Sequence, residues 1–319
     1  MGRACGLVRC HTEHMNKILV IGSSGFVGGH VARALVAEGY AVRCLARNPA
    51  KVRDLAALGC EVVQGDIADL ASMRRALEGV DAAYIAVHTL SPQGADTAGK
   101  GFMDVEMQGL QNIVAACRAH GVRRLVYVTF LGAAPDGASA WIRGRWQTEQ
   151  FLLHSGLDVT VIRPGMIVGM GGQGFAMTVR NARRRVSIVI GSGQQRFRPI
   201  AIDDLVAYLV GVLAEPRAYG QCYDVGSDDV LTTDQMIDVA AAAQGRQQPR
   251  KIHLPRALLG ALAPLIERMT KTPQGALKGM LDGLKTDMIG DPTPIRALLP
   301  RPPLSYRQAA ERALTTEEL

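Results

Sequence analysis

Three glycines with a fixed spacing are the first residues in the chain that could do chemistry. Gly22, Gly25 and Gly28 follow the strand-like run 17–21, whose last four residues are apolar, and precede an apolar stripe with helical spacing. Glycines in this pattern permit a tight turn, close backbone approach to a pyrophosphate and close contact between helix and strand. The free N–H groups at the helix start would face the phosphates. The sequence therefore predicts a dinucleotide pocket, whose turn consists of Gly22, Ser23, Ser24, Gly25, Phe26, Val27 and Gly28.

The end of the second expected strand, 40–46, bears on which nucleotide is bound. Arg47 and Lys51 follow it, and no acidic residue is in reach. An acid there usually accepts the ribose 2′-hydroxyl of NAD, whereas the planar fork of arginine suits the extra phosphate of NADP. We therefore expect NADP(H), with NAD(H) as the second option. The alternative is that Arg47 and Lys51 only cap a loop and a solvated helix.

A carboxylate follows the third expected strand, 61–64. Asp66 is placed to accept a hydrogen bond from the adenine amino group, while Ile67 packs on the ring. Asp66 could equally begin the next helix, although Asp69 is better placed for that N-cap.

Two residues end the fourth expected strand at the edge of the same cleft. They are Val87 and His88, and His88 is the only histidine positioned to titrate beside a nicotinamide. The alternative interpretation of His88 is a satisfied loop residue without a catalytic part.

Strand and helix patterns alternate along the first half of the chain. Strands are expected at 17–21, 40–46, 61–64, 82–87, 124–129 and 158–162. The clearest helix covers 105–120. This alternation predicts an α/β fold, a Rossmann-type doubly wound parallel sheet with helices on both faces. The ligand should lie beyond the carboxyl ends of the strands, where the first and fourth strands diverge.

The pattern becomes less regular after about residue 169. We expect a strand at 221–225 and helices at 203–214, 233–243, 256–269 and 306–314. Residues 15–168 would form the nucleotide-binding domain. Residues 169–319 would form a smaller, closely integrated α+β lobe over the substrate side of the cleft. Residues 1–14 show no periodicity and are expected to be a disordered extension, so translation could also start at Met15.

Composition indicates an ordinary globular protein of the cytoplasm. The chain has 319 residues, 48% of them hydrophobic, and its apolar stretch 258–266 is shorter than the ~20 residues that span a bilayer. We expect reduced thiols at the scattered cysteines, which are Cys5, Cys10, Cys44, Cys60, Cys117 and Cys222. No metal site is expected, because Cys5, Cys10, His11 and His14 lack the paired spacing of a zinc site.

A net charge of +7 raises the question of a nucleic-acid partner, because arginines cluster before the strand-like run 186–190. They are Arg180, Arg183, Arg184 and Arg185. Aromatics make up only 5% of the chain and do not interleave with this cluster, so a solvated helix face is favoured over a nucleic-acid surface. An anionic substrate or membrane surface is the third option.

In this order, these residues resemble the extended and atypical branches of the short-chain dehydrogenase/reductase superfamily. The similarity rests on the glycine turn, Gly65 with Asp66, Asp81, and Arg163-Pro164-Gly165, and it covers most of the chain from Met15 onward. A narrower similarity to the NmrA-like group, which includes the NADPH-binding accessory subunit of respiratory complex I, rests on other stretches. These are 83–88, 198–204, 223–226 with 231–232, and 302–306.

The resemblance implies that the usual proton-transfer pair is missing. Dehydrogenases of the superfamily use Tyr-x-x-x-Lys, and the corresponding positions here are Trp141 and Arg145. An indole N–H cannot exchange a proton at neutral pH, whereas arginine stays charged and could hold the nicotinamide ribose. The resemblance also implies a hydroxyl near the nicotinamide at Thr129, although a plain strand residue is equally compatible. Pro164 would lie against the cofactor.

Three functions remain compatible with the sequence. The first is a reductase that moves hydride from NADPH to an apolar or conjugated small molecule, at an activated double bond or quinone-like group. Its candidate catalytic residues are Thr129, Arg145 and His88. The second is a non-catalytic NADP(H) sensor or accessory subunit of a larger complex, with or without peripheral membrane association. The third is an epimerase or dehydratase, which would need the missing tyrosine.

Overall fold

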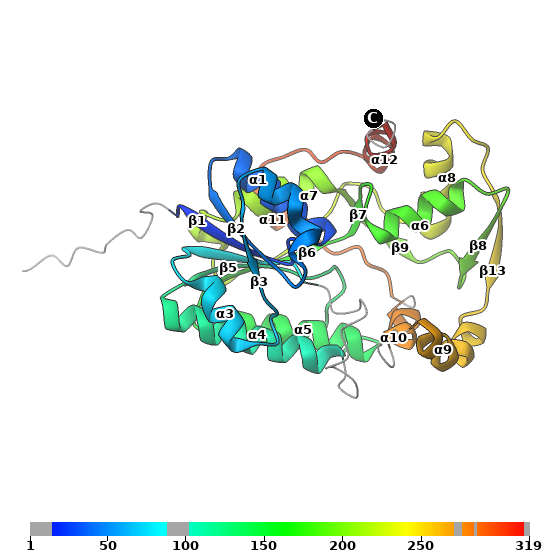
Figure 1. Cartoon of the computed structure of the whole chain (residues 1–319). Helices are drawn as coiled ribbons and strands as arrows, with labels where there is room; N and C mark the ends of the chain where they lie inside the picture. Colours follow the sequence, from blue (N-terminus) through cyan, green and yellow to red (C-terminus); the bar gives the residue numbers. More distant parts are fainter. Residues whose placement is uncertain (1–14, 88–101, 271–275, 284–285, 316–319) are drawn as a thin grey trace, which may run out of the picture.

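A seven-stranded parallel sheet forms the centre of the protein, which we describe from a computed structural model covering residues 15–87, 102–270, 276–283 and 286–315 (Figure 1). The strand order is β11-β6-β5-β4-β1-β2-β3. The strands are β1 (Lys17–Ile21), β2 (Ala41–Ala46), β3 (Glu61–Gln64), β4 (Ala82–Ile85), β5 (Arg124–Val128), β6 (Asp158–Pro164) and β11 (Cys222–Val225). The predicted Rossmann-type fold is confirmed, and β4 lies beside β1 with β2 on the other side.

Helices cover both faces of the sheet because its central strands are apolar on both sides. Along β1, Ile18 and Val20 point into one core, and Leu19 and Ile21 point into the other. The first face carries α1 (Phe26–Ala37), α2 (Arg53–Ala57), α7 (Ile202–Gly211) and α11 (Thr293–Leu298). The second carries α3 (Leu70–Leu77), α4 (Phe102–His120) and α5 (Ala140–Leu153).

Beyond the carboxyl edge of the sheet lies a second, smaller core. Phe175, Met236 and Tyr306 lie at its centre. Its helices are α6 (Gln173–Ala182), α8 (Thr233–Ala243) and α12 (Tyr306–Thr315). Short strands pair around them, namely β7 (Met166–Val168) with β10 (Pro199–Ala201), β9 (Arg196–Phe197) with β12 (Leu231–Thr232), and β8 (Val186–Ile190) with β13 (Arg250–Leu254).

A pair of helices links this second core back to the first half of the chain. Helix α9 (Arg256–Thr270) contains Pro264 and packs against α10 (Ala276–Gly283), which in turn contacts α5 (Figure 1). Within the described residues, none of the helices combines the length and apolar character needed to cross a membrane.

Most expected elements are present, with different ends. Helix α7 stops at Gly211 rather than 214, because the Arg124 guanidinium donates hydrogen bonds to the carbonyl oxygens of Val212 (2.6 Å) and Leu213 (2.8 Å). Such bonds satisfy carbonyls that a helix end leaves free.

Strand β13 was not expected, because its charged residues obscure the alternation of apolar and polar residues that is typical of a strand. Within the described residues, the cysteines Cys44, Cys60, Cys117 and Cys222 are free thiols, and Cys5, Cys10, His11 and His14 lie outside this part.

Candidate nucleotide-binding site

Two of the three glycines are required by the packing of the turn itself. Gly22 has a φ of +90°, and a Cβ placed on it would lie 2.5 Å from the carbonyl oxygen of Ala86 at the end of β4. A Cβ on Gly28 would lie 2.2 Å from the carbonyl oxygen of Gly22. Because both distances are far below van der Waals contact, only glycine lets the first turn of α1 lie against β1 and β4.

The third glycine is exposed and borders the space in front of the helix start. A Cβ on Gly25 would meet only the carbonyl oxygen of Gly22, at 3.2 Å, and Gly25 is exposed. Helix α1 begins at Phe26 with no side-chain cap and no acidic residue in its first turn among the described residues. Its first N–H groups therefore face this space without a competing acceptor. A pyrophosphate fits here, since the N–H groups and the helix dipole both favour an anion.

Serine and phenylalanine in the turn fix its position relative to the rest of the fold. Ser23 is buried and its hydroxyl donates to the carbonyl oxygen of Leu45 in β2 (3.2 Å). The Phe26 ring packs against the loop 169–172, where a Cβ on Gly169 would lie 2.8 Å from it. Ser24 is exposed and Val27 is half-buried. Phe26 therefore joins the turn to the second core through its ring, and only its backbone faces the phosphate space.

The carboxyl end of β2 presents a cation next to the turn. Arg47 directly follows β2, two residues after Leu45, whose carbonyl oxygen holds Ser23, and the Arg47 side chain is exposed. Its carbonyl oxygen accepts a hydrogen bond from the Gln64 side chain (3.3 Å), which ties this loop to β3. A role for Arg33, which lies on α1, was not predicted from the sequence. Arg33 forms an ion pair with Asp54 on α2 and so neutralises the acid closest in sequence to Arg47.

The loop after β3 contains two aspartates with different hydrogen-bond partners. Asp69, not Asp66, caps α3 by accepting from Ala71 N (3.0 Å) and Ser72 N (3.2 Å), as its position predicted. Asp66 accepts from the N–H of Ala68 (3.0 Å) and remains half-buried.

Ile67 is anchored on both its backbone and its side chain. Its carbonyl oxygen accepts from the Asn112 side chain (2.8 Å), and a Cβ on Gly109 would lie 2.5 Å from its Cδ1. Val87, half-buried, follows β4 and borders the glycine turn, since its N lies 3.2 Å from the Cβ position of Gly22. Ile67 and Asp66 thus follow the end of β3, and Val87 follows the end of β4, as expected from the sequence. His88 lies outside the described residues.

Arg145 does not point toward the cleft. Its side chain is 2% exposed, and its Nη1 lies 2.6 Å from Glu106 Oε1 and 3.1 Å from the Tyr127 hydroxyl oxygen. The Tyr127 hydroxyl also donates to Glu106 (2.8 Å), and burial raises the pKa of Tyr127. A buried guanidinium needs such a partner, because an unpaired buried charge is very costly. This placement disagrees with the expected contact between Arg145 and a nicotinamide ribose.

Trp141 sits in an aromatic stack. Its ring lies 4.1 Å from that of Phe130 with an interplanar angle of 16°, and it is half-buried. A Cβ on Gly283, at the end of α10, would lie 3.8 Å from the indole. The stack therefore occupies the region between the end of β5 and α10, where the superfamily's dehydrogenases would have a tyrosine.

Thr129 and Pro164 lie at the carboxyl ends of β5 and β6. Thr129 is half-buried beside Glu149, which forms a buried ion pair with Arg163. Burial raises the pKa of Glu149, and the hydrogen bonds that Arg163 donates to it oppose that rise. Pro164 is buried, and its carbonyl oxygen accepts from Leu131 N (2.9 Å).

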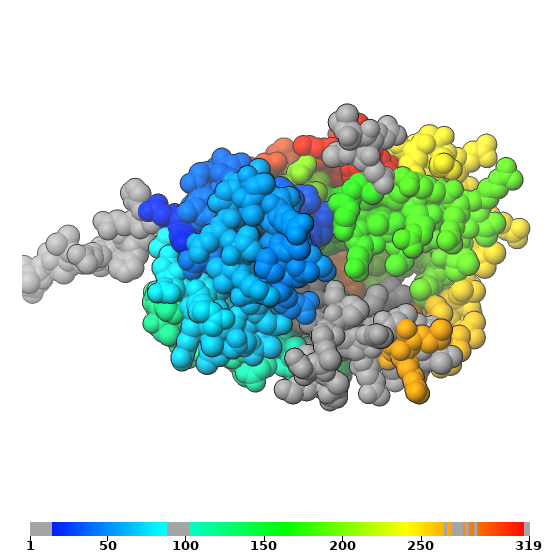
Figure 2. All heavy atoms as spheres, in the orientation of Figure 1, coloured from blue at the N-terminus to red at the C-terminus, as the bar shows by residue number. Residues whose placement is uncertain are grey.

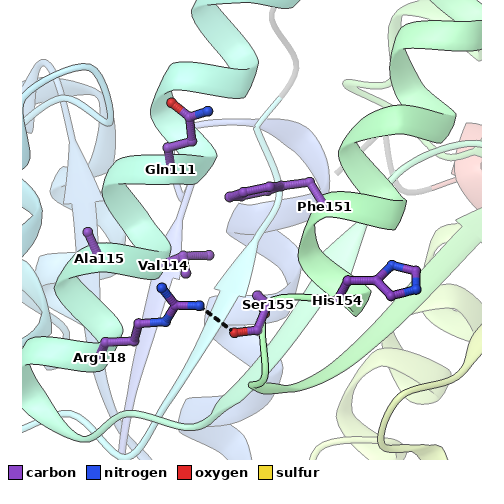
Figure 3. Close-up of a pocket in the computed structure, with 7 residues that line it drawn as sticks. All are labelled: Gln111, Val114, Ala115, Arg118, Phe151, His154 and Ser155. Carbon is purple, nitrogen blue, oxygen red and sulfur yellow. Dashed lines mark hydrogen bonds between the residues drawn. The ribbon is translucent and has the colours of Figure 1, made fainter.

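A surface groove elsewhere on the molecule does not belong to this site. It lies between the later turns of α4 and α5, where Phe151 and Val114 face each other and Arg118 donates to the carbonyl oxygen of Ser155 (2.8 Å) (Figure 3). Trp141 and Arg145 lie at the other end of α5. None of the residues that line this groove belongs to the predicted cofactor or catalytic set.

The turn, the uncapped helix start and the sheet topology define a dinucleotide-binding protein of the Rossmann class. Residues 22–193, more than half of the chain, match the family model described as NAD(P)H-binding, and the chain belongs to that family.

Known relatives include enzymes and an accessory subunit. The chain is 28% identical to an NAD(P)H azoreductase of Xenophilus azovorans, over 72% of this chain and 74% of that protein. It is 24% identical to the mitochondrial NADH dehydrogenase (ubiquinone) 1 alpha subcomplex subunit 9 of Arabidopsis thaliana, over 76% of this chain and 61% of that protein. The expected resemblance to atypical short-chain reductases and a complex I subunit is thus confirmed.

Solved structures show the same fold. An NADPH-dependent quinone oxidoreductase from Escherichia coli superposes with a TM-score of 0.71, at 22% identity, over 93% of this chain and 99% of that one. At this level of identity the similarity concerns the fold alone.

Proposed function

We propose that the protein is an NAD(P)H-dependent oxidoreductase that prefers NADPH and reduces an apolar, conjugated acceptor such as a quinone, an azo compound or an activated double bond. The proposal rests on the combination of an uncapped helix start behind the exposed Gly25 with Trp141 and Arg145 at the positions of the proton-transfer pair. The azoreductase among the relatives supports the reaction type.

Residues at the strand ends would hold the cofactor. The N–H groups at the start of α1 would bind the pyrophosphate, Arg47 the 2′-phosphate, and Asp66 with Ile67 the adenine. Val87 and Pro164 would lie along the rest of the dinucleotide, toward the nicotinamide. When bound, the reduced nicotinamide supplies a hydride, and the acceptor takes one further proton to complete a two-electron reduction.

The chain's own side chains favour acceptors that need no strong acid. Trp141 cannot exchange a proton, and Arg145 is committed to Glu106. Quinones and azo compounds gain negative charge on oxygen or nitrogen atoms that water can protonate. Simple ketones depend on a general acid, which contributes about 10²- to 10⁴-fold. Reduction of conjugated acceptors therefore suits this site better than alcohol oxidation.

The aromatic stack favours a planar, apolar acceptor. Trp141 and Phe130 form a continuous apolar surface that extends toward α10. Aromatic rings prefer offset stacking on such surfaces, with a gain of about 0.5–1.5 kcal/mol beyond simple burial. A conjugated ring system is the kind of substrate that uses this surface.

Oxidation of NADPH by the purified chain tests the proposal. The loss of nicotinamide absorbance would be followed with a benzoquinone, an azo dye and an enone, with a simple ketone and a secondary alcohol plus NADP as comparisons. We expect turnover with the conjugated acceptors and background rates with the other two. Deuterium carried from C4-labelled NADPH into an enone product would establish direct hydride transfer.

The contrary results are distinct. Tight NADPH retention without turnover, in a protein that copurifies with a larger assembly, would replace the proposal with the accessory-subunit function. Preferential oxidation of secondary alcohols would show that an acid–base group has been missed.

A further inference from the structure

One face of the two-stranded sheet β8–β13 is bare, in that none of the described elements covers it. The strands pair in parallel, and alternate side chains along a strand share a face. The other face is covered, since Val189 packs against Ile237 of α8 and Lys251 forms an ion pair with Asp238. The bare face consists of Val186, Ile188, Ile190, Arg250, Ile252 and Leu254.

This face exposes an unusual amount of apolar surface. The exposed fractions are 43% for Val186, 47% for Ile188, 39% for Ile190 and 46% for Ile252. Single exposed apolar residues are common, but a contiguous group of β-branched side chains on a sheet indicates a binding surface. Figure 2 shows the β8 and β13 segments, in green and yellow, at the edge of the molecule away from β1.

Helix α9 adds a second apolar strip directly after β13. Leu258, Leu262 and Met269 are 54%, 44% and 76% exposed. Their spacing of four and seven residues places them on one side of the helix. Only Pro255 separates β13 from α9, so the strip follows the sheet directly in the chain.

Charge is strongly segregated around these elements. The stretches 169–202 and 239–266, which carry β8, β13 and most of α9, hold ten arginine and lysine residues and no aspartate or glutamate. Since the whole chain has a net charge of +7, the rest of it is slightly acidic. Arg184 and Arg185 precede Val186 directly, Arg250 stands within the face, and all three are exposed.

We propose that this surface, the β8–β13 face together with the α9 strip, docks peripherally on a bilayer of anionic phospholipids. Apolar side chains with arginines at one end of the face match the acyl boundary and the phosphate groups of such a membrane.

Two other occupants fit less well. A second copy of the chain would bring Arg184, Arg185 and Arg250 against the same charges. Two strands of five residues are also small beside the about 800 Å² per partner of a stable interface. Nucleic acid would gain nothing from the apolar centre of the face.

Flotation of the full chain with lipid vesicles tests the proposal. We expect binding to vesicles containing phosphatidylglycerol, little binding to pure phosphatidylcholine, and weakening by salt. The double variant R184Q/R185Q should lower the partition coefficient about fivefold for each arginine. I188Q/I252Q should lower it at least roughly tenfold. Matched controls are R74Q/R75Q, an exposed arginine pair on α3, and L58Q, which is 50% exposed in the wild type; both should bind as before.

NADPH affinity and melting temperature should be unchanged in all four variants, which keeps a folding defect distinct from a lost membrane contact. The proposal is overturned if the wild type ignores phosphatidylglycerol vesicles, or if the face variants and their controls bind alike. It is also overturned if light scattering reveals a dimer that I188Q/I252Q dissociates, or if duplex DNA binds with the same dependence on these variants and vesicles do not.

Discussion

Arg145 Nη1 lies 2.6 Å from Glu106 Oε1 in the interior between α4 and α5, and neither side chain is more than 2% exposed. The Tyr127 and Thr148 hydroxyls complete the network, with 3.1 Å between their oxygens. In the resemblance to short-chain dehydrogenases, Arg145 stands where a lysine would activate tyrosine and hold the ribose. Here the cation instead joins two helices to β5. Arg145 thus stabilises the packing of the helices at a position that the superfamily's dehydrogenases use for catalysis.

We predict that Arg145→Met destabilises the fold by about 3–5 kcal/mol, because it leaves Glu106 buried without this cation. Denaturant unfolding would measure the loss. The double variant E106L/R145M should recover most of it, since a well-packed apolar pair avoids the desolvation penalty. Arg143→Met, an exposed change on the same helix, is the control and should cost less than about 1 kcal/mol. An R145M protein of normal stability that fails to bind NADPH would return Arg145 to the cofactor site.

Restoring tyrosine at position 141 should not create an acid catalyst. Because Arg145 is held by Glu106, it is not available to lower the pKa of a tyrosine one helical turn away. Trp141→Tyr and Trp141→Phe should therefore have the same turnover with conjugated acceptors, to within about twofold, against the 10²- to 10⁴-fold expected of a working general acid. The measurement is the pH dependence of kcat for both variants. A hydroxyl-dependent rate gain with a new ionisation would contradict the structural role given to Arg145.

The backbone geometry of the site could be predicted from the sequence. The spacing of the glycines indicates the turn, because Gly22 and Gly28 occupy positions that leave no room for a Cβ and therefore require glycine. The capping role of Asp69 was equally predictable from its position before a helix.

The direction of a long side chain could not be predicted in the same way. Arg145 could have faced the cleft or the interior, and the choice depends on Glu106, 39 residues earlier, whose burial is a property of the folded helix pair. The Phe26 ring and the bare face of β8–β13 also depend on partners that are distant in sequence. Tertiary contacts of this kind leave no local pattern.

Arg47→Glu should shift nucleotide preference from NADP toward NAD. The variant loses an ionic contact to the 2′-phosphate and gains an acceptor for the 2′-hydroxyl. We expect the ratio of the two dissociation constants to change by at least about tenfold. Lys51→Glu, an exposed change in the same loop, is the matched control and should have a smaller effect. If Arg47→Glu leaves the preference unchanged, Arg33 becomes the first candidate for the phosphate contact, and Arg33→Gln would test it.

Gly25→Val should abolish nucleotide binding without unfolding the protein. Gly25 has a φ of −90°, which other residues also adopt, and its Cβ position lies 3.2 Å from the carbonyl oxygen of Gly22, so a side chain there requires only a small shift of the turn. The added methyl groups would occupy the space expected for the pyrophosphate and weaken NADPH binding by at least about two orders of magnitude. Isothermal titration would measure the affinity, and thermal melting would measure the fold. Gly28→Val provides the contrast: its Cβ would lie 2.2 Å from a carbonyl oxygen, so this variant should fail to fold at all. Normal NADPH affinity in Gly25→Val would place the pyrophosphate elsewhere and refute the site.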